Sequence, residues 1–140
     1  MADNSKKKLC IVASAPSGII SFWKTNIEKL APHFDVYVVA NFTDEKVFDG
    51  LCIKGAKSVN IERRPTITSG LRAVRELKQY FKQMHFDGFI SMSSNASLVA
   101  AIAGKMTRVP FRCRIFTGQI WMNRTGLSRM FFKMIDRFTV

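Results

Sequence analysis

Short apolar runs alternate along this chain with segments whose apolar residues recur at helical spacing. Residues 8–13 form a nearly continuous apolar run before a Pro-Ser-Gly turn, as is typical of a strand buried on both faces. After this run, Ile20, Trp23 and Ile27 share one helical face until Pro32 ends the pattern. The two patterns predict strands at residues 8–13, 34–40, 57–61, 86–92 and 111–116 and helices at 20–30, 71–84, 93–106 and from 125 onward.

Strands separated by helices need crossover connections, which place consecutive strands parallel. We therefore expect an α/β fold, a Rossmann-like open parallel sheet with helices on both faces. Leu71 begins the apolar stripe of the second predicted helix, and Ser69 is the candidate N-cap. The small residues of the third predicted helix would let it lie close to the sheet. The last helix carries an apolar stripe that we expect to be buried: Leu127, Met130, Phe131, Met134, Ile135 and Phe138.

Composition indicates one folded domain with a basic second half. The 140 residues are 47% hydrophobic and 23% charged, which excludes disordered, collagen-like and disulfide-scaffold classes. Of the net charge of +12, residues 61–140 contribute 14 basic and 4 acidic side chains. Nucleic acid, an anionic membrane surface and phosphorylated small molecules all fit this charge.

The cysteines and the hydropathy predict a cytoplasmic protein. Cys10, Cys52 and Cys113 are widely spaced, without a CxxC pattern, so we expect buried, reduced thiols. The longest purely apolar run, residues 98–104, is far shorter than the roughly 20 residues that span a bilayer.

In open parallel sheets, ligands bind beyond the carboxyl ends of the strands, so the loops there are candidate sites. Ser17 and Gly18 follow the first strand without a GxGxxG or Walker pattern, and they fit either a phosphate or sugar cradle or a tight turn. After the fourth strand, Ser93, Ser94 and Asn95 offer more polar groups than helix capping alone requires.

The loop after the fifth strand combines backbone freedom, amides and a stacking face. Its candidate ligand-contacting residues are Thr117, Gly118, Gln119, Trp121 and Arg124. This combination is typical of sugar recognition. A tryptophan that packs beneath the loop is the structural alternative.

Three motifs in this part of the chain indicate a family. They are Val-Pro-Phe-Arg at 109–112, Phe-Thr-Gly-Gln-Ile-Trp at 116–121 and Lys-Met-Ile-Asp-Arg at 133–137. With residues 9–13, 34–41 and 61–65, they give a pattern that resembles the N-terminal lobe of bacterial family 4 glycosyltransferases over essentially the whole chain. Members of this family act in capsule, exopolysaccharide or lipopolysaccharide assembly.

The resemblance implies one lobe of a GT-B fold and retaining transfer from a nucleotide-sugar to an acceptor, often on a polyprenyl diphosphate. Residues 1–140 would be an N-terminal acceptor-binding lobe, apparently truncated and inactive alone. The nucleotide-sugar and its glutamate pair would belong to a second lobe. Ser17 and Gly18 would lie near the donor diphosphate and the acceptor, and residues 117–121 would line the acceptor side.

We expect no metal or other cofactor, and we assign no catalytic residue. Some relatives carry a histidine near the end of the fifth strand, where this chain has Arg114 and Thr117. Its two histidines, His33 and His85, fall at predicted helix ends.

The final helix suits an anionic membrane surface. Arg129, Lys133 and Arg137 recur every four residues, and Phe132 lies outside the apolar stripe. We expect peripheral attachment to the inner face of the plasma membrane through these four residues. Alternatively, the stripe packs on the sheet and the bases face water.

Two other functions fit the residues. One is a non-catalytic basic α/β module that binds nucleic acid or another phosphorylated ligand, although the chain carries no helix-turn-helix, RRM or zinc motif, and we expect no nucleic acid. The other is a small flavodoxin-like or nucleotide-binding protein, although the sequence carries no phosphate-binding motif that would support it.

Overall fold

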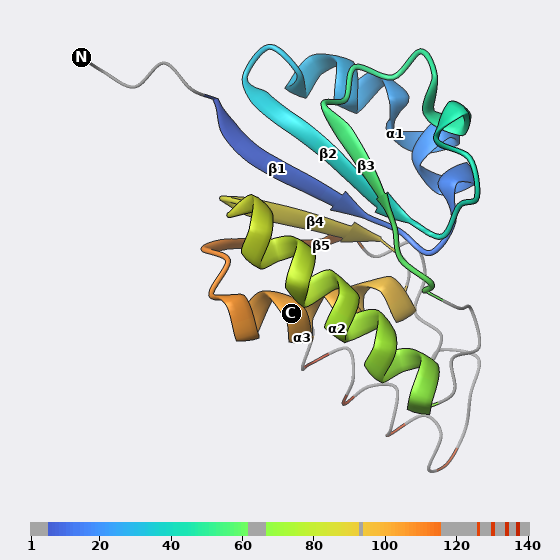
Figure 1. Ribbon diagram of the computed structural model, residues 1–140, viewed down its shortest axis with the longest axis vertical. Helices are drawn as coiled ribbons and strands as arrows, with labels where there is room; N and C mark the ends of the chain where they lie inside the picture. Colours follow the sequence, from blue (N-terminus) through green and yellow to red (C-terminus); the bar gives the residue numbers. More distant parts are fainter. Residues whose placement is uncertain are drawn as a thin grey trace.

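Five parallel strands form the centre of the molecule. The computed structural model describes residues 6–61, 67–92, 94–115 and the single positions 126, 130, 134 and 137. Within these residues the strand order is β3-β2-β1-β4-β5, and each neighbouring pair is parallel (Figure 1). The elements are β1 (Lys7–Val12), α1 (Pro16–Leu30), β2 (Phe34–Ala40), the 3₁₀ helix η1 (Glu45–Phe48), β3 (Gly55–Ser58), α2 (Ile67–Met84), β4 (Gly88–Met92), α3 (Ser94–Thr107) and β5 (Phe111–Ile115).

Helices cover both faces of this sheet, as predicted. In Figure 1, α1 lies on one side and α2 and α3 lie together on the other. Side chains alternate between the faces of a strand, so β1 contributes to two cores. Ile11 packs with Ile19 and Ile27 of α1, whereas Cys10 and Val12 pack in the core beneath α2 and α3. The predicted Rossmann-like α/β architecture is therefore confirmed.

The small residues of α3 explain its close approach to the sheet. Ala96, Ala100 and Ala103 are buried on its inner side, and Gly104 lies against the ring of Phe89 on β4. A larger side chain at these positions would hold the helix away from the strands. The Ala/Gly-rich composition was the sequence signal for this packing.

The third strand begins earlier than predicted. The structure places β3 at Gly55–Ser58, whereas the apolar alternation predicted 57–61. Pairing with β2 runs only from Gly55 to Ser58. Val59 and Ile61 are buried just beyond the last ladder pair, so their apolar side chains mark core positions after the strand.

Three smaller predictions were wrong. Leu71 is 66% exposed, because the inner face of α2 is formed by Ala73, Leu77 and Phe81. Ser69 lies inside α2, which begins two residues earlier, so it is not the N-cap. Of the cysteines expected to be buried, only Cys10 is, while Cys52 is exposed and Cys113 half-buried.

Candidate functional site at the carboxyl edge of the sheet

The chain reverses its winding direction between β1 and β4. These strands are neighbours in the sheet, yet the helix that follows β1 covers one face and the helix that follows β4 covers the other. The two connections therefore diverge at the carboxyl ends of the strands. In open α/β sheets this divergence leaves a crevice where ligands bind. The loops predicted as sites after β1 and β4 both lie here.

The first turn of α1 opens toward this edge without a side-chain cap. Its N-cap residue, Ala15, has an extended backbone (φ −136°, ψ 147°) and offers no capping side-chain hydrogen bond, and Pro16 follows. Backbone N–H groups at a helix start have no partner within the helix, and they carry a partial positive charge. Ser17, in this first turn, is exposed. This arrangement suits an anion.

Gly18 brings the start of α1 against the end of β4. A Cβ at residue 18 would lie 3.7 Å from the Sδ atom of Met92, which is ordinary van der Waals contact. The structure therefore brings Ser17 and Gly18 together with the segment that leads into α3. Two loops that are separated by more than seventy positions in the sequence meet at one edge.

The polar residues after β4 have different roles. Ser94 and Asn95 occupy the first turn of α3, and Asn95 is half-buried. Ser91, one of the hydroxyls before them, is buried, and its Oγ donates a hydrogen bond to the carbonyl oxygen of Cys113 at 3.4 Å. Ser91 thus joins β4 to β5. The described polar residues that remain at the carboxyl edge after β4 are Ser94 and Asn95, at the start of α3.

Sequence reasoning missed a polar cluster at the same edge, beyond β2 and β3. The Nδ2 of Asn41 donates a hydrogen bond to the Oδ1 of Asn60 at 3.0 Å. The Oγ of Ser58 donates to the carbonyl oxygen of Phe42 at 2.7 Å. The backbone N–H of Asn41 also donates to the carbonyl oxygen of Ser14, in the loop after β1, at 3.3 Å. The signal available in the sequence was the position of Asn41 directly after an apolar strand.

Several predicted site residues lie outside the described part of the chain. They are Ser93, Thr117, Gly118, Gln119, Trp121 and Arg124 of the acceptor site and Arg129, Phe132 and Lys133 of the membrane surface.

The four described positions near the C-terminus are all exposed. They are Gly126, Arg137, Met130, which is 69% exposed, and Met134, which is 61% exposed. At Met130 and Met134 the apolar stripe of the last predicted helix is therefore not buried against the described part of the chain.

Among the described residues, the two groups with shifted pKa values lie in the core or pack against it. Burial raises the pKa of the Cys10 thiol and of the Tyr80 hydroxyl far above their usual values. Tyr80 packs edge-on against Phe86, with ring centroids 5.4 Å apart. Neither group is presented at the carboxyl edge. His85 directly follows α2, and His33 lies three residues after the last residue of α1, so both lie near helix ends as the sequence predicted.

Two further structural findings concern the part of the chain that is described. It holds no group of three or more His, Cys, Asp or Glu side chains placed to bind a metal ion. None of its helices combines the length and the apolar character needed to cross a bilayer.

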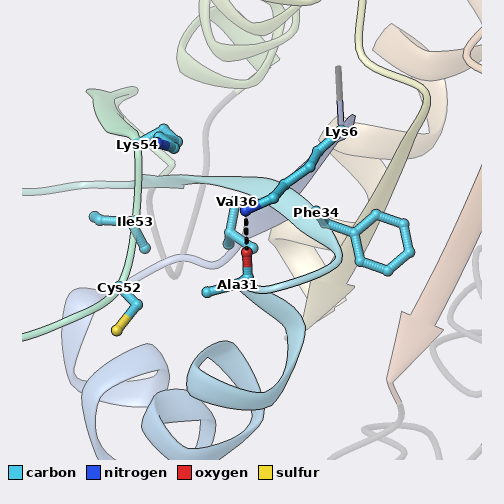
Figure 2. Close-up of a pocket in the computed structure, with 7 residues that line it drawn as sticks. All are labelled: Lys6, Ala31, Phe34, Val36, Cys52, Ile53 and Lys54. Atoms are coloured by element: carbon cyan, nitrogen blue, oxygen red, sulfur yellow. Dashed lines mark hydrogen bonds between the residues drawn. The ribbon is translucent and has the colours of Figure 1, made fainter. Parts of the chain in front are cut away.

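A cavity of about 250 Å³ lies at the other, amino edge of the sheet (Figure 2). Phe34 and Val36 of β2 form part of its wall, and Cys52 and Lys54 approach from the segment before β3. The ammonium group of Lys6 donates a hydrogen bond to the carbonyl oxygen of Ala31 at 3.1 Å, as the dashed line in Figure 2 marks. This cavity is separate from the candidate site.

Comparison with known proteins identifies solved structures with a similar fold. No protein-family model matches the chain, and no curated protein matches it. Three similar solved structures are a UDP-N-acetylglucosamine 2-epimerase (TM-score 0.67, 20% identity, 96% of this chain), MurG from Acinetobacter baumannii (0.63, 13%, 92%) and the apo form of the lipopolysaccharide outer core galactosyltransferase WaaB (0.57, 16%, 89%).

The chain spans 38%, 39% and 37% of these three proteins, respectively. They are GT-B-fold proteins, so the predicted Rossmann-like α/β fold of a GT-B lobe is confirmed. At these identities the likeness concerns the fold alone. Membership of glycosyltransferase family 4 stays a prediction.

Proposed function

We propose that this chain is the acceptor-binding N-terminal lobe of a retaining glycosyltransferase in surface polysaccharide synthesis. The enzyme would transfer a sugar from a nucleotide-sugar to a glycan acceptor on a polyprenyl diphosphate or another membrane lipid. The observation that carries the proposal is the uncapped start of α1 beside the end of β4, at the point where the sheet changes its winding direction. Two similar folds, MurG and a galactosyltransferase, support it.

The residues at this edge suggest a division of labour. The N–H groups of the first turn of α1 and the Ser17 hydroxyl would bind a diphosphate, and Gly18 would let this turn lie close to Met92 at the end of β4. Ser93, Ser94 and Asn95 would contact the acceptor at the start of α3. The rest of the acceptor side would come from Thr117, Gly118, Gln119, Trp121 and Arg124.

The proposed enzyme would also contain a second lobe. The chain spans only 37% to 39% of the three similar structures. The nucleotide-sugar would bind mainly to the second lobe, and residues 1–140 alone would not catalyse transfer. We assign no catalytic residue within the chain.

Attachment to the cytoplasmic face of the membrane would bring the lobe to a lipid-linked acceptor. Arg129, Phe132, Lys133 and Arg137 would contact anionic headgroups. The exposure of Met130, Met134 and Arg137 supports this role, because apolar and basic side chains together favour a lipid interface.

A sugar-nucleotide epimerase is the second candidate. The observation that favours it is the TM-score of 0.67 to a UDP-N-acetylglucosamine 2-epimerase, compared with 0.63 to MurG and 0.57 to WaaB. An epimerase changes the sugar on the nucleotide and needs no lipid acceptor. A basic module that binds nucleic acid or another phosphorylated ligand is the non-catalytic alternative.

One assay separates these candidates. The gene product that carries this chain is incubated with radiolabelled UDP-N-acetylglucosamine, UDP-galactose or UDP-glucose, with and without membrane lipid extract. We expect label to enter the lipid fraction only when the extract is present, with the anomeric configuration of the donor retained. A changed sugar on the free nucleotide without lipid would instead identify an epimerase. If no nucleotide-sugar is bound or turned over, the proposal fails, and a gel-shift at low salt tests the nucleic-acid alternative.

A further inference from the structure

A second cavity, of about 470 Å³, opens between the C-terminal ends of α2 and α3. These helix ends lead into the amino ends of β4 and β5, so the cavity lies across the sheet from the candidate acceptor site. Eight described residues line it: Phe81, Lys82, His85, Phe86, Met106, Thr107, Arg108 and Val109. Its volume falls within the roughly 300–1,000 Å³ of small-molecule sites.

The floor of this cavity is apolar and well packed. Phe81, Phe86 and Val109 are only 2%, 4% and 5% exposed. The ring of Phe86 packs edge-on against that of Phe81, with centroids 5.7 Å apart, and against Tyr37 at 5.4 Å. Met106 adds an apolar side chain that is 54% exposed. The floor is therefore fixed by the core, whereas the opening faces solvent.

The rim is cationic. Lys82, His85 and Arg108 are exposed, and no acidic residue is among the eight that line the cavity. The acid nearest in sequence, Asp87, is already engaged, because its Oδ2 accepts a hydrogen bond from the backbone N–H of Lys8 at 2.8 Å. An anion at the rim would meet basic groups without a competing carboxylate from the lining.

Backbone conformation adds a second observation. His85 and Arg108 are the two non-glycine residues with positive φ among those described, at 52° and 57°. Each directly follows a helix, where glycine is the usual residue because it adopts this conformation without strain. The chain instead carries a basic side chain at both positions. Bases near helix C-termini also offset the helix dipole, but this effect does not account for the cavity between them.

We propose that this cavity binds a small amphipathic anion. The apolar chain or ring of the ligand lies on Phe86 and Val109, and its carboxylate or phosphate group lies between Lys82 and Arg108. Charge-assisted hydrogen bonds to two bases and contact with an apolar floor together select for such a ligand over a simple salt or a neutral lipid. The inference does not depend on the proposed glycosyltransferase function.

The 140-residue chain can be titrated with octanoate, with 1-octanol, which lacks the charge, and with acetate, which lacks the apolar chain. We expect saturable binding of one octanoate, with NMR shift changes centred on Phe86 and Val109, and binding at least about tenfold weaker for the other two compounds. The double variant Lys82→Gln/Arg108→Asn should weaken octanoate binding about tenfold or more. Asparagine is chosen at 108 because it tolerates positive φ.

The double variant Arg72→Gln/Arg75→Gln is the matched control, since it removes two exposed charges from α2 outside the cavity. It should leave octanoate binding within about twofold of the wild type. The proposal is overturned if octanol binds as well as octanoate, if the control variant weakens binding equally, or if the shift changes map elsewhere. It also fails if phosphatidylglycerol vesicles, but not octanoate, bind in a Lys82- and Arg108-dependent manner. Circular dichroism confirms that each variant is folded.

Discussion

Gly104 on α3 lies directly against the ring of Phe89 on β4, so that a side chain at residue 104 has no room. A Cβ there would collide with the Cε1 atom of Phe89 and lie 3.0 Å from its Cζ. We therefore expect Gly104→Ala to lower the free energy of unfolding by about 1–3 kcal/mol, because the ring is 2% exposed and cannot move aside freely. Urea unfolding followed by circular dichroism measures this change.

Gly70 on α2 provides the matched control. A Cβ at this position would meet no atom within 4 Å. Gly70→Ala should raise the free energy of unfolding by about 0.5–1 kcal/mol, because alanine loses less backbone entropy in a helix. If both variants change stability in the same direction, the close packing of α3 on β4 is not the cause.

The alternation of strands and helices was predictable because each element carries its own period of apolar residues. The position of β1 between β2 and β4, and hence of Gly18 beside Met92, was not predicted, because right-handed crossovers make the strands parallel without fixing their order. The end of β3 was less readable, since Val59 continues the apolar pattern after strand pairing stops at Ser58.

Features that depend on how segments distant in the sequence come together could not be predicted from the sequence. The hydrogen bond between Asn41 and Asn60 joins two loops that the sequence shows only as separate polar residues. The cavity between α2 and α3 depends on where two helix ends come to lie, which no local pattern records. The exposure of Leu71 has the same origin, because residues 73, 77 and 81 decide which face of α2 is buried.

Burial of Cys10 predicts a loss of stability in alkaline solution. Burial raises the pKa of this thiol far above the value of about 8.5 of an exposed cysteine. Above about pH 8.5 the thiol of Cys10 loses its proton in the unfolded chain but keeps it in the folded chain. A rise in pH therefore favours the unfolded state. The free energy of unfolding should fall by about 1.4 kcal/mol per pH unit from this group.

Urea titrations at pH 7.0, 9.0 and 9.75 measure the slope. Cys10→Ala should be less stable at every pH, because it leaves a cavity, but the slope between about pH 8.5 and 10 should become shallower by the contribution of one proton. Tyr80, whose pKa is also raised chiefly by burial, adds a further loss above about pH 10 in both proteins. An unchanged slope in Cys10→Ala would contradict this assignment.

The three cysteines should react with thiol reagents at different rates. Cys52 is exposed, Cys113 is half-buried and Cys10 is completely buried. With N-ethylmaleimide at pH 7.5, mass spectrometry of digested samples should show Cys52 modified first and Cys10 modified only when denaturant unfolds the chain. Early modification of Cys10 in native buffer would mean that the strand β1 is not in the centre of the sheet.

The proposed membrane surface predicts salt-sensitive binding to anionic vesicles. Replacing Arg129, Lys133 and Arg137 by glutamine should weaken binding to phosphatidylglycerol vesicles by roughly two orders of magnitude, at about 1 kcal/mol for each base near the surface. The matched control replaces the exposed Lys24, Lys29 and Lys46 by glutamine, which removes the same charge elsewhere. Vesicle co-sedimentation at low and high salt compares the variants, and equal losses in both would show that only the net charge matters.

Ser17→Glu separates the stability of α1 from its proposed role in binding. A negative charge in the first turn of a helix interacts favourably with the helix dipole, so this variant should be more stable by about 0.3–1 kcal/mol. The same charge would repel a diphosphate at the uncapped helix start, and binding of inorganic pyrophosphate, measured by calorimetry, should weaken about tenfold or more. Thr25→Glu is the control, because this exposed residue lies about 12 Å farther along the axis, beyond the Debye length of about 8 Å at physiological salt. It should leave pyrophosphate binding unchanged. If Ser17→Glu gains stability yet binds pyrophosphate as the wild type does, the start of α1 is not the diphosphate site, whatever the fold of the lobe.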